Sequence, residues 1–167
     1  PWGALSMAEE LDDPREVPWH PRLARAVVGH DAVEALFASS LATGKPHHAW
    51  LLAGPQGIGK ATLAYRLARL ALAAGRGNAA QTDHWVAARA HPDLAVLERG
   101  FTDSKPKRLR NEITVDDARH FVDFFSRTAG NDGWRVGIVD SADALNTEAA
   151  NALLKLVEEP PSKCLIL

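Results

Sequence analysis

The chain has 167 residues, which is enough for one domain with its own hydrophobic core. Hydrophobic residues make up 46% and charged residues 24%, and the net charge of −2 excludes a general electrostatic attraction to nucleic acid. The single cysteine, Cys164, excludes an internal disulfide and favours a reducing, cytoplasmic location. There is no secretory signal and no apolar run of about 20 residues, so we expect no membrane partner.

The first 26 residues are polar, punctuated by proline and weakly patterned, and we interpret them as a leader arm. Met7 is the only methionine, so we interpret it as the natural start and residues 1–6 as a remnant foreign to the protein; an authentic extension is the alternative. The chain ends within an apolar run, 164–167, typical of a buried strand. We therefore expect a domain over 27–167 that is truncated in its last strand.

Helices and strands are predicted to alternate along the rest of the chain. Apolar residues recur at helical spacing, between start and stop signals, over 31–43, 61–74, 85–90, 114–125 and 148–158. Short apolar runs between turn residues predict buried strands at 49–53, 94–97, 135–139 and 164–167. Loops are expected at 75–83, 99–111 and 130–133. This alternation predicts an α/β fold of three layers, with a parallel central sheet covered by helices on both faces.

Two of these helices carry more detailed expectations. Asp31 to Glu34 resembles a capping box at the start of the first helix. The residues expected to face the core are Leu63, Leu67, Leu70 and Ala74 in one helix, and Ala149, Ala152, Leu153, Leu156 and Val157 in the last one.

A glycine-rich segment between the first strand and the second helix predicts a phosphate-binding loop. Residues 54–60 read Gly-Pro-Gln-Gly-Ile-Gly-Lys and match the G-x-x-x-x-G-K pattern of a P-loop. The glycines let backbone N–H groups point at a phosphate, and the positive end of the following helix is aimed at the same place. Lys60 would reach the terminal phosphates. A glycine turn with a surface lysine is the alternative, but the strand before the motif and the helix after it disfavour that interpretation.

Two residues that a hydrolysing site needs are missing. Ala61 follows Lys60, where a working P-loop has Ser or Thr to bind Mg²⁺. Thr62 is a poor substitute, because one helical step turns a side chain by about 100°. The strand ending in Asp140 resembles a Walker B strand, but Ser141 stands where AAA+ hydrolases have the Glu that positions water. Asp143 is expected to be a turn or cap residue, and replacing that Glu is its alternative role.

One segment makes the resemblance to a known family specific. Residues 151–161, Asn-Ala-Leu-Leu-Lys-Leu-Val-Glu-Glu-Pro-Pro, resemble the N-A-L-L-K-x-x-E-E-P-P signature of bacterial DNA polymerase III clamp-loader subunits. Val28-Gly29-His30 resembles the V-G-Q segment that borders the adenine pocket in that family, and 48–49 and 91–93 also match. The resemblance covers roughly 27–167 and implies an AAA+ P-loop domain of the RecA-like type, without the lid and collar domains, which would lie beyond Leu167.

The resemblance implies a function and a set of site residues. Ala61 and Ser141 favour the non-hydrolysing delta prime type, which would help load the sliding clamp onto primed DNA beside gamma/tau and delta subunits. We expect ATP or ADP to bind without hydrolysis, with weak or absent binding left open, and no catalytic residue. The expected nucleotide-site residues are Val28, Gly29, Gly54, Gln56, Gly57, Ile58, Gly59, Lys60, Ala61 and Thr62, with Asp140, Ser141 and Asp143 as the Walker B-like segment.

Two other classes stay open at this point. An active gamma/tau-type ATPase would use Thr62 and Asp143 in place of the missing groups. A P-loop kinase would need a second substrate pocket and a lid arginine, which the sequence does not reveal. Many members of the resembled family carry a four-cysteine zinc module before the His91-Pro-Asp segment. Residues 75–90 have no cysteine, and His84 and His91 alone cannot build a tetrahedral site, so we predict no zinc or other metal.

The remaining candidates have simpler interpretations. Lys105, Lys107, Arg108 and Arg110 form a basic run that we expect to be a solvated loop, with contact to DNA phosphates as the alternative. Cys164 is expected to be a small buried hydrophobe rather than a reactive thiol. Trp50, Trp134, His47 and His48 are expected to pack or hydrogen-bond rather than stack on bases or bind metal.

Overall fold

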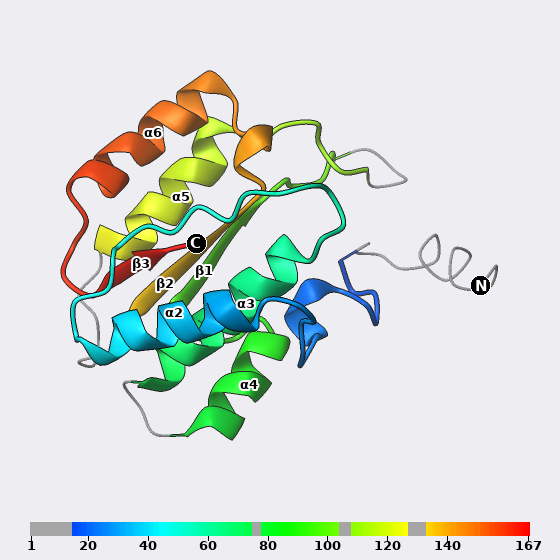
Figure 1. The fold of residues 1–167 in the computed structure, drawn as a ribbon. Coiled ribbons are helices and arrows are strands. Elements are labelled where there is room, and N and C mark those ends of the chain that lie inside the picture. Colours follow the sequence, from blue (N-terminus) through cyan, green and yellow to red (C-terminus); the bar gives the residue numbers. More distant parts are fainter. Residues whose placement is uncertain (1–14, 75–77, 104–107, 127–132) are drawn as a thin grey trace.

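The computed structural model describes residues 15–74, 78–103, 108–126 and 133–167. Its helices are η1 (Pro21–Leu23), α2 (Asp31–Ala42), α3 (Lys60–Ala74), α4 (Ala79–Ala87), α5 (Val115–Ser126), η2 (Ala142–Ala144) and α6 (Thr147–Glu158). Its strands are β1 (Leu94–Glu98), β2 (Arg135–Asp140) and β3 (Cys164–Ile166) (Figure 1). None of the described helices is long and apolar enough to cross a membrane.

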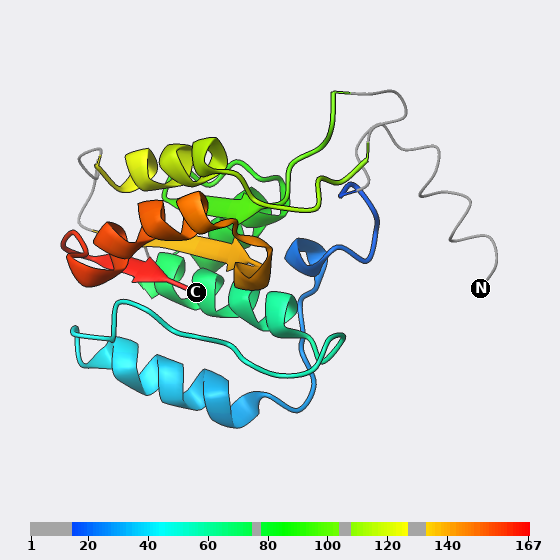
Figure 2. The ribbon, with the colours of Figure 1, turned by 90° about the horizontal axis from the view of Figure 1, so that it is seen from above.

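The three strands form a parallel sheet in the order β1-β2-β3. The register places Val96 opposite Ile138 and Glu98 opposite Asp140, so the carboxyl ends of β1 and β2 coincide. Figure 2 shows α5 and α6 on one face of the sheet and α2 and α3 on the other. The predicted three-layer α/β fold with a parallel sheet is therefore confirmed.

Each face of the sheet has its own core, because side chains alternate along a strand. Val136, Ile138 and Leu165 pack against α2 and α3, where Phe37 and Leu67 are fully buried. On the other face, residues of α5 and α6 such as Phe121, Phe125 and Leu153 cover β1 and β3. Two helix predictions were wrong in detail: Leu70 and Val157 are 37% and 38% exposed, and Ala74 is also exposed. Ala64, Ala68 and Ala71 complete the buried face of α3 instead.

Local sequence explains most helix boundaries. Thr114 and Asp117 form the predicted start of α5, with the backbone N–H and the hydroxyl of Thr114 both donating to the Asp117 carboxylate, at 3.0 and 2.7 Å. Asn146 caps α6 by accepting from the N–H of Ala149 at 2.9 Å. The predicted capping box at Asp31 was wrong. The helix follows His30 without a side-chain cap, and Glu34 binds Arg66 rather than a backbone N–H.

The predicted buried strand at 49–53 was also wrong. Only Ala49 forms a bridge, to Ile166, and the N–H of Trp50 donates to the Ile166 carbonyl at 2.9 Å. Residues 51–53 belong to none of the strands in the described part of the chain. Leu51 is 86% exposed. Trp50 packs edge-on against Phe37, which confirms its expected packing role.

The segment expected as a loop over 75–83 with a helix at 85–90 folds differently. Residues 79–87 form α4, and Asn78, which we read as a loop residue, caps it by accepting from the N–H of Gln81 at 3.0 Å. The expected loop at 99–111 is confirmed over its described part, where Phe101 and Leu109 form one isolated bridge. Most of the turn expected at 130–133 lies outside the described residues, as do Lys105 and Lys107.

Residues 15–30 run along α3 and α4 rather than standing free. Arg22 is 4% exposed and donates to the carbonyls of Arg15 and Ala87, at 2.7 and 3.0 Å, and to the Glu16 carboxylate at 2.6 Å. Arg69 of α3 binds Asp83 of α4 at 2.7 Å and also donates to the Arg22 carbonyl. The described part of the expected leader arm is thus attached to the domain. Its first 14 residues lie outside the described range.

Candidate nucleotide-binding site

The predicted phosphate loop lies between the bridge at Ala49 and the start of α3. Gly57 and Gly59 have φ of 85° and 95°, a conformation that L side chains rarely adopt. α3 begins at Lys60, directly after the loop, and the N–H of Leu63 donates to the Gly59 carbonyl at 2.9 Å. The loop therefore leads into a helix whose first N–H groups and dipole face an exposed backbone turn, which suits an anion.

Lys60 lies over the mouth of this loop. Its ammonium donates to the carbonyls of Gly54 and Pro55, at 2.8 and 2.9 Å. A bound phosphate would compete with these two carbonyls for the same ammonium. Binding of phosphates by Lys60 stays a prediction.

The predicted Val28-Gly29 segment lies against the phosphate loop. The His30 Nε2 atom is 2.9 Å from the Ile58 carbonyl, and a Cβ built on Gly59 would be 3.3 Å from Val27 Cγ2. Gly29 has φ of 82°, and Val28 is 93% exposed. The structure therefore brings together 27–30 and 54–60, which are separated by two dozen residues in the sequence.

The positions that would face a metal ion offer fewer ligand atoms than a hydrolysing site needs. Ala61 and Thr62 are half-buried in the first turn of α3, and the Ala61 methyl group offers no oxygen to a cation. Asp140 ends β2 opposite Glu98 of β1. Burial raises the pKa of the Asp140 carboxyl, and Glu98 raises that pKa further, while Arg99 and Lys60 lower it.

The segment after Asp140 carries the residues that we weighed as replacements. Ser141 is exposed, and its side chain makes no capping hydrogen bond to η2. Asp143 lies within η2, between β2 and α6, and is exposed. Asp143 was expected in a turn or cap, and it lies in a short 3-10 helix between β2 and α6 instead. A role for it in water activation stays a prediction.

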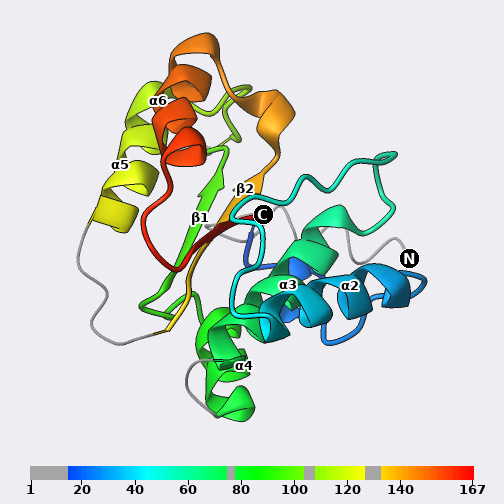
Figure 3. The same cartoon turned by 60° about the vertical axis from the view of Figure 1, so that its left-hand side comes forward.

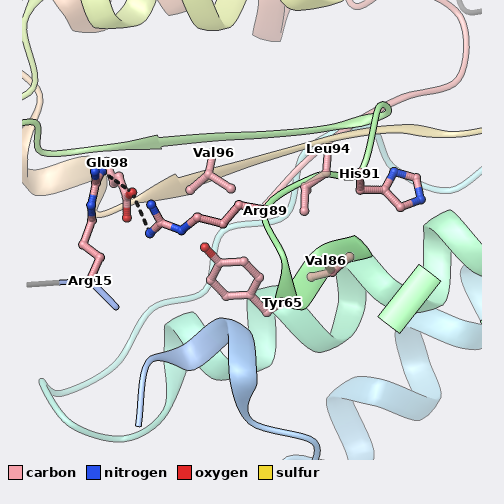
Figure 4. A pocket seen from close by; sticks show the side chains of 8 residues that line it. All are labelled: Arg15, Tyr65, Val86, Arg89, His91, Leu94, Val96 and Glu98. Atoms are coloured by element: carbon pink, nitrogen blue, oxygen red, sulfur yellow. Dashed lines mark hydrogen bonds and ion pairs between the residues drawn. The ribbon is translucent and has the colours of Figure 1, made fainter. Parts of the chain in front are cut away.

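One feature near the site was missed by the sequence reasoning. A cavity of about 280 Å³ separates β1 from α3 and α4, and Figure 4 shows the side chains that line it. Glu98 is held there by Arg15 at 2.7 Å and Arg89 at 3.2 Å (Figure 4). Burial raises the pKa of Tyr65, which also lines this cavity, to about 12. The residues that hold Glu98 come from distant parts of the sequence, so no single motif marks Arg15, Arg89 and Glu98 as a group.

The other candidates mostly fulfil the simpler interpretations. Cys164 is buried and Trp134 packs against the core, as predicted. His48 Nε2 is 2.9 Å from the Val157 carbonyl, so its expected hydrogen-bond role is confirmed. Arg110 departs from the expected solvated run, since it pairs with Asp117 at 2.8 Å. Within the described ranges, no three His, Cys, Asp or Glu side chains are grouped as a metal would require.

Comparisons with known proteins fit this geometry. The family model for the DNA polymerase III delta subunit matches residues 29–167. The chain is 40% identical to subunit delta′ of Pseudomonas aeruginosa, over 72% of this chain and 36% of the relative. It is 33% identical to subunit gamma/tau of Mycobacterium tuberculosis (89% and 25% covered) and 31% identical to subunit tau of Escherichia coli (86% and 22%). The chain spans about a quarter to a third of the length of these relatives. It belongs to the DNA polymerase III delta subunit family of clamp-loader proteins.

Proposed function

We propose that the chain is the nucleotide-site domain of a delta prime-type clamp-loader subunit that binds nucleotide without hydrolysing it. The observation that carries this proposal is the pair Ala61 and Ser141, beside an intact phosphate loop. The higher identity to a delta′ subunit than to the gamma and tau subunits supports it. The subunit would act in the cytoplasm with gamma/tau and delta subunits to load the sliding clamp onto primed DNA.

The proposed division of roles follows from the chemistry of the side chains. The backbone of 54–60 and the Lys60 ammonium would hold the phosphates, and Val28 with Ile58 would border the base. A bound Mg²⁺ would supply charge neutralisation between the phosphates, but the Ala61 methyl group cannot hold it. The Ser141 hydroxyl is a poor base near neutral pH, so it would not orient and activate a water molecule as the carboxylate of a Glu would. ATP or ADP would therefore serve as a structural ligand.

A gamma/tau-type ATPase is the alternative, favoured by the identities of 28–33% to gamma and tau subunits. It would need Thr62 to reach the metal and Asp143 to orient water. Thr62 follows Ala61 by one helical step, and Asp143 lies on η2, beyond the end of β2. This alternative therefore requires two side chains to act from positions that ordinary sites do not use.

Calorimetric titration of ATP, once with Mg²⁺ and once with EDTA, tests the proposal. We expect nearly equal affinity in the two buffers, and no binding by a Lys60→Ala variant. Affinity that is lost in EDTA would favour the gamma/tau alternative, and no binding in either buffer would leave the loop an architectural element. The double variant Ala61→Thr, Ser141→Glu should gain dependence on Mg²⁺, which the wild-type chain measured in parallel should lack.

A further inference from the structure

One side chain of α3 joins the two ends of the segment that borders the phosphate loop. Arg66 Nε and Nη2 donate to the two Glu34 carboxylate oxygens, at 2.5 and 2.6 Å. Its third nitrogen, Nη1, donates to the Arg25 carbonyl at 2.5 Å. Arg25 precedes Val27–His30 and Glu34 follows it, so one guanidinium holds both flanks of this segment.

The segment held in this way has few other attachments to the phosphate loop. The described contacts are the packing of Val27 against Gly59 and the 2.9 Å approach of the His30 ring to the Ile58 carbonyl. Val28 is 93% exposed and Ile58 is 49% exposed, so the segment and the loop each present an apolar side chain to solvent. α2 and α3 lie side by side in Figure 3, with the start of α2 fixed by Glu34. Val27 also packs against the core between the sheet and α2 and α3, while Arg66 holds both ends of the segment that carries Val28.

We propose that Arg66 is a positioning residue for the base-binding side of the nucleotide site. It holds Val28 beside the phosphate loop, where an exposed apolar side chain can cover the flat face of a purine base. Arg66 does not approach the phosphates itself, since its three contacts all go to Glu34 and Arg25. This inference rests on the proposed nucleotide binding and adds to it the residue that orders the base contact.

The geometry requires arginine rather than any cation. A planar guanidinium can donate two parallel hydrogen bonds to a carboxylate and keep a third donor for a carbonyl, whereas an ammonium acts as a point charge. The side chains of Arg66 and Glu34 are 30% and 19% exposed, so water screens the pair only in part. The hydrogen bond from Arg66 lowers the pKa of the Glu34 carboxyl, which is consistent with a persistent contact.

Two titrations of the full chain separate the base side from the phosphate side. ATP reports both, whereas inorganic tripolyphosphate reports the loop and Lys60 alone. In Arg66→Gln we expect the Kd for ATP to rise about tenfold, which corresponds to about one tenth of the molecules having the binding-competent conformation. We expect the Kd for tripolyphosphate to change less than about twofold. Arg66→Lys should give an intermediate Kd for ATP. Equal losses for both ligands, or no loss for ATP, would overturn the inference.

Arg110→Gln is the matched control. Arg110 also donates to both oxygens of a carboxylate, that of Asp117, and the exposed fractions of the pair, 32% and 27%, resemble those of Arg66 and Glu34. Asp117 belongs to α5, and α5 covers the opposite face of the sheet (Figure 2). A similar general loss of stability is expected, with both dissociation constants unchanged. A rise in the Kd for ATP in this variant would mean that stability, not positioning, explains the effect.

Hydrogen exchange measured without nucleotide tests the positioning role of Arg66 independently of the proposed nucleotide binding. The backbone amides of 27–30 should exchange faster in Arg66→Gln than in the wild type or in Arg110→Gln. If the wild-type chain binds neither ATP nor tripolyphosphate, the proposed nucleotide binding fails, and faster exchange would still show that Arg66 orders the segment. Unchanged exchange at 27–30 in Arg66→Gln would overturn the positioning role itself.

Discussion

Replacing Gly137 with alanine tests how closely α5 packs on the strand that carries Asp140. A Cβ built on Gly137 would be 2.4 Å from Phe121 Cζ and 2.8 Å from Phe125 Cζ, whereas ordinary contact begins at 3.4 Å. The nearest ring would have to move by about 1 Å. Phe121 and Phe125 are only 4% and 3% exposed, so neither ring can swing into solvent.

The expected cost follows from these distances. Forcing one extra methyl group into a well-packed core typically destabilises a domain by about 1–3 kcal/mol. Alanine also lowers the conformational entropy of the unfolded chain relative to glycine, and this offsets roughly 0.4–1 kcal/mol of the destabilisation. We therefore expect a net loss of about 1–2 kcal/mol, which lowers Tm by roughly 2–8 °C in a domain of this size.

Urea unfolding followed by circular dichroism measures this change. We expect a lower midpoint with an unchanged m-value, because the unfolded surface stays the same. Gly133→Ala is the matched control, since a Cβ at Gly133 would meet nothing within 4 Å. If Gly137→Ala is as stable as Gly133→Ala, then α5 does not press on β2 as the structure shows, and the close-packing argument is refuted.

Three further outcomes are expected. Asn146→Ala should cost about 1 kcal/mol in urea unfolding through the lost cap of α6, while Asn146→Asp should restore most of it. The pKa of Glu34 lies below its ordinary value of 4.5 because Arg66 donates to the carboxylate. The pair therefore contributes its full stabilisation of the folded state above pH 4.5, and this stabilisation is lost as the pH falls through the folded-state pKa of Glu34. Glu34→Gln should therefore reduce stability at pH 7 more than at pH 3, and an equal loss at both pH values would contradict the reasoning. Burial raises the pKa of the Cys164 thiol to about 12. A thiol reagent at pH 8 should therefore label Cys164 only as fast as the domain opens. Fast labelling of the folded chain would show that Cys164 is accessible.

Local signals in the sequence were enough to predict the motifs and most elements. The glycines before Lys60 and the polar residues that start α5 and α6 act over a few neighbouring residues, so sequence reasoning could locate them. The strand expected at 49–53 was wrong because an apolar run becomes a strand only where its backbone pairs with a neighbour, and within the described residues of this run only Ala49 forms a bridge, to Ile166. The start of α4 was missed because Asn, as at Asn78, both caps helices and occurs in loops.

The candidate site was predictable to the same extent. Gly54 to Lys60, Val28 and Asp140 could be named from pattern and resemblance, and the structure brings the neighbours of Val28, Val27 and His30, to Ile58 and Gly59 of the loop. The contacts that hold Val28 there could not be named. Arg66 and Glu34 are 32 residues apart; Arg66 carries no pattern that distinguishes it from an ordinary surface charge, and the pattern at Glu34 indicated a capping box instead. Long-range pairs of this kind depend on the fold and not on the local sequence.

The attachment of residues 15–25 through arginines has a consequence for how the sequence can vary. The guanidinium groups of Arg22, Arg66 and Arg69 bind carbonyl oxygens of Arg15, Arg25 and Arg22. Every residue has a backbone carbonyl whatever its side chain, so these contacts depend on the course of the main chain and not on the side chains along it. The Arg25 side chain is 88% exposed, and exchanging it would leave its carbonyl in place for Arg66. Related chains can therefore differ widely along this segment while keeping its course, provided that the arginines that bind it are retained.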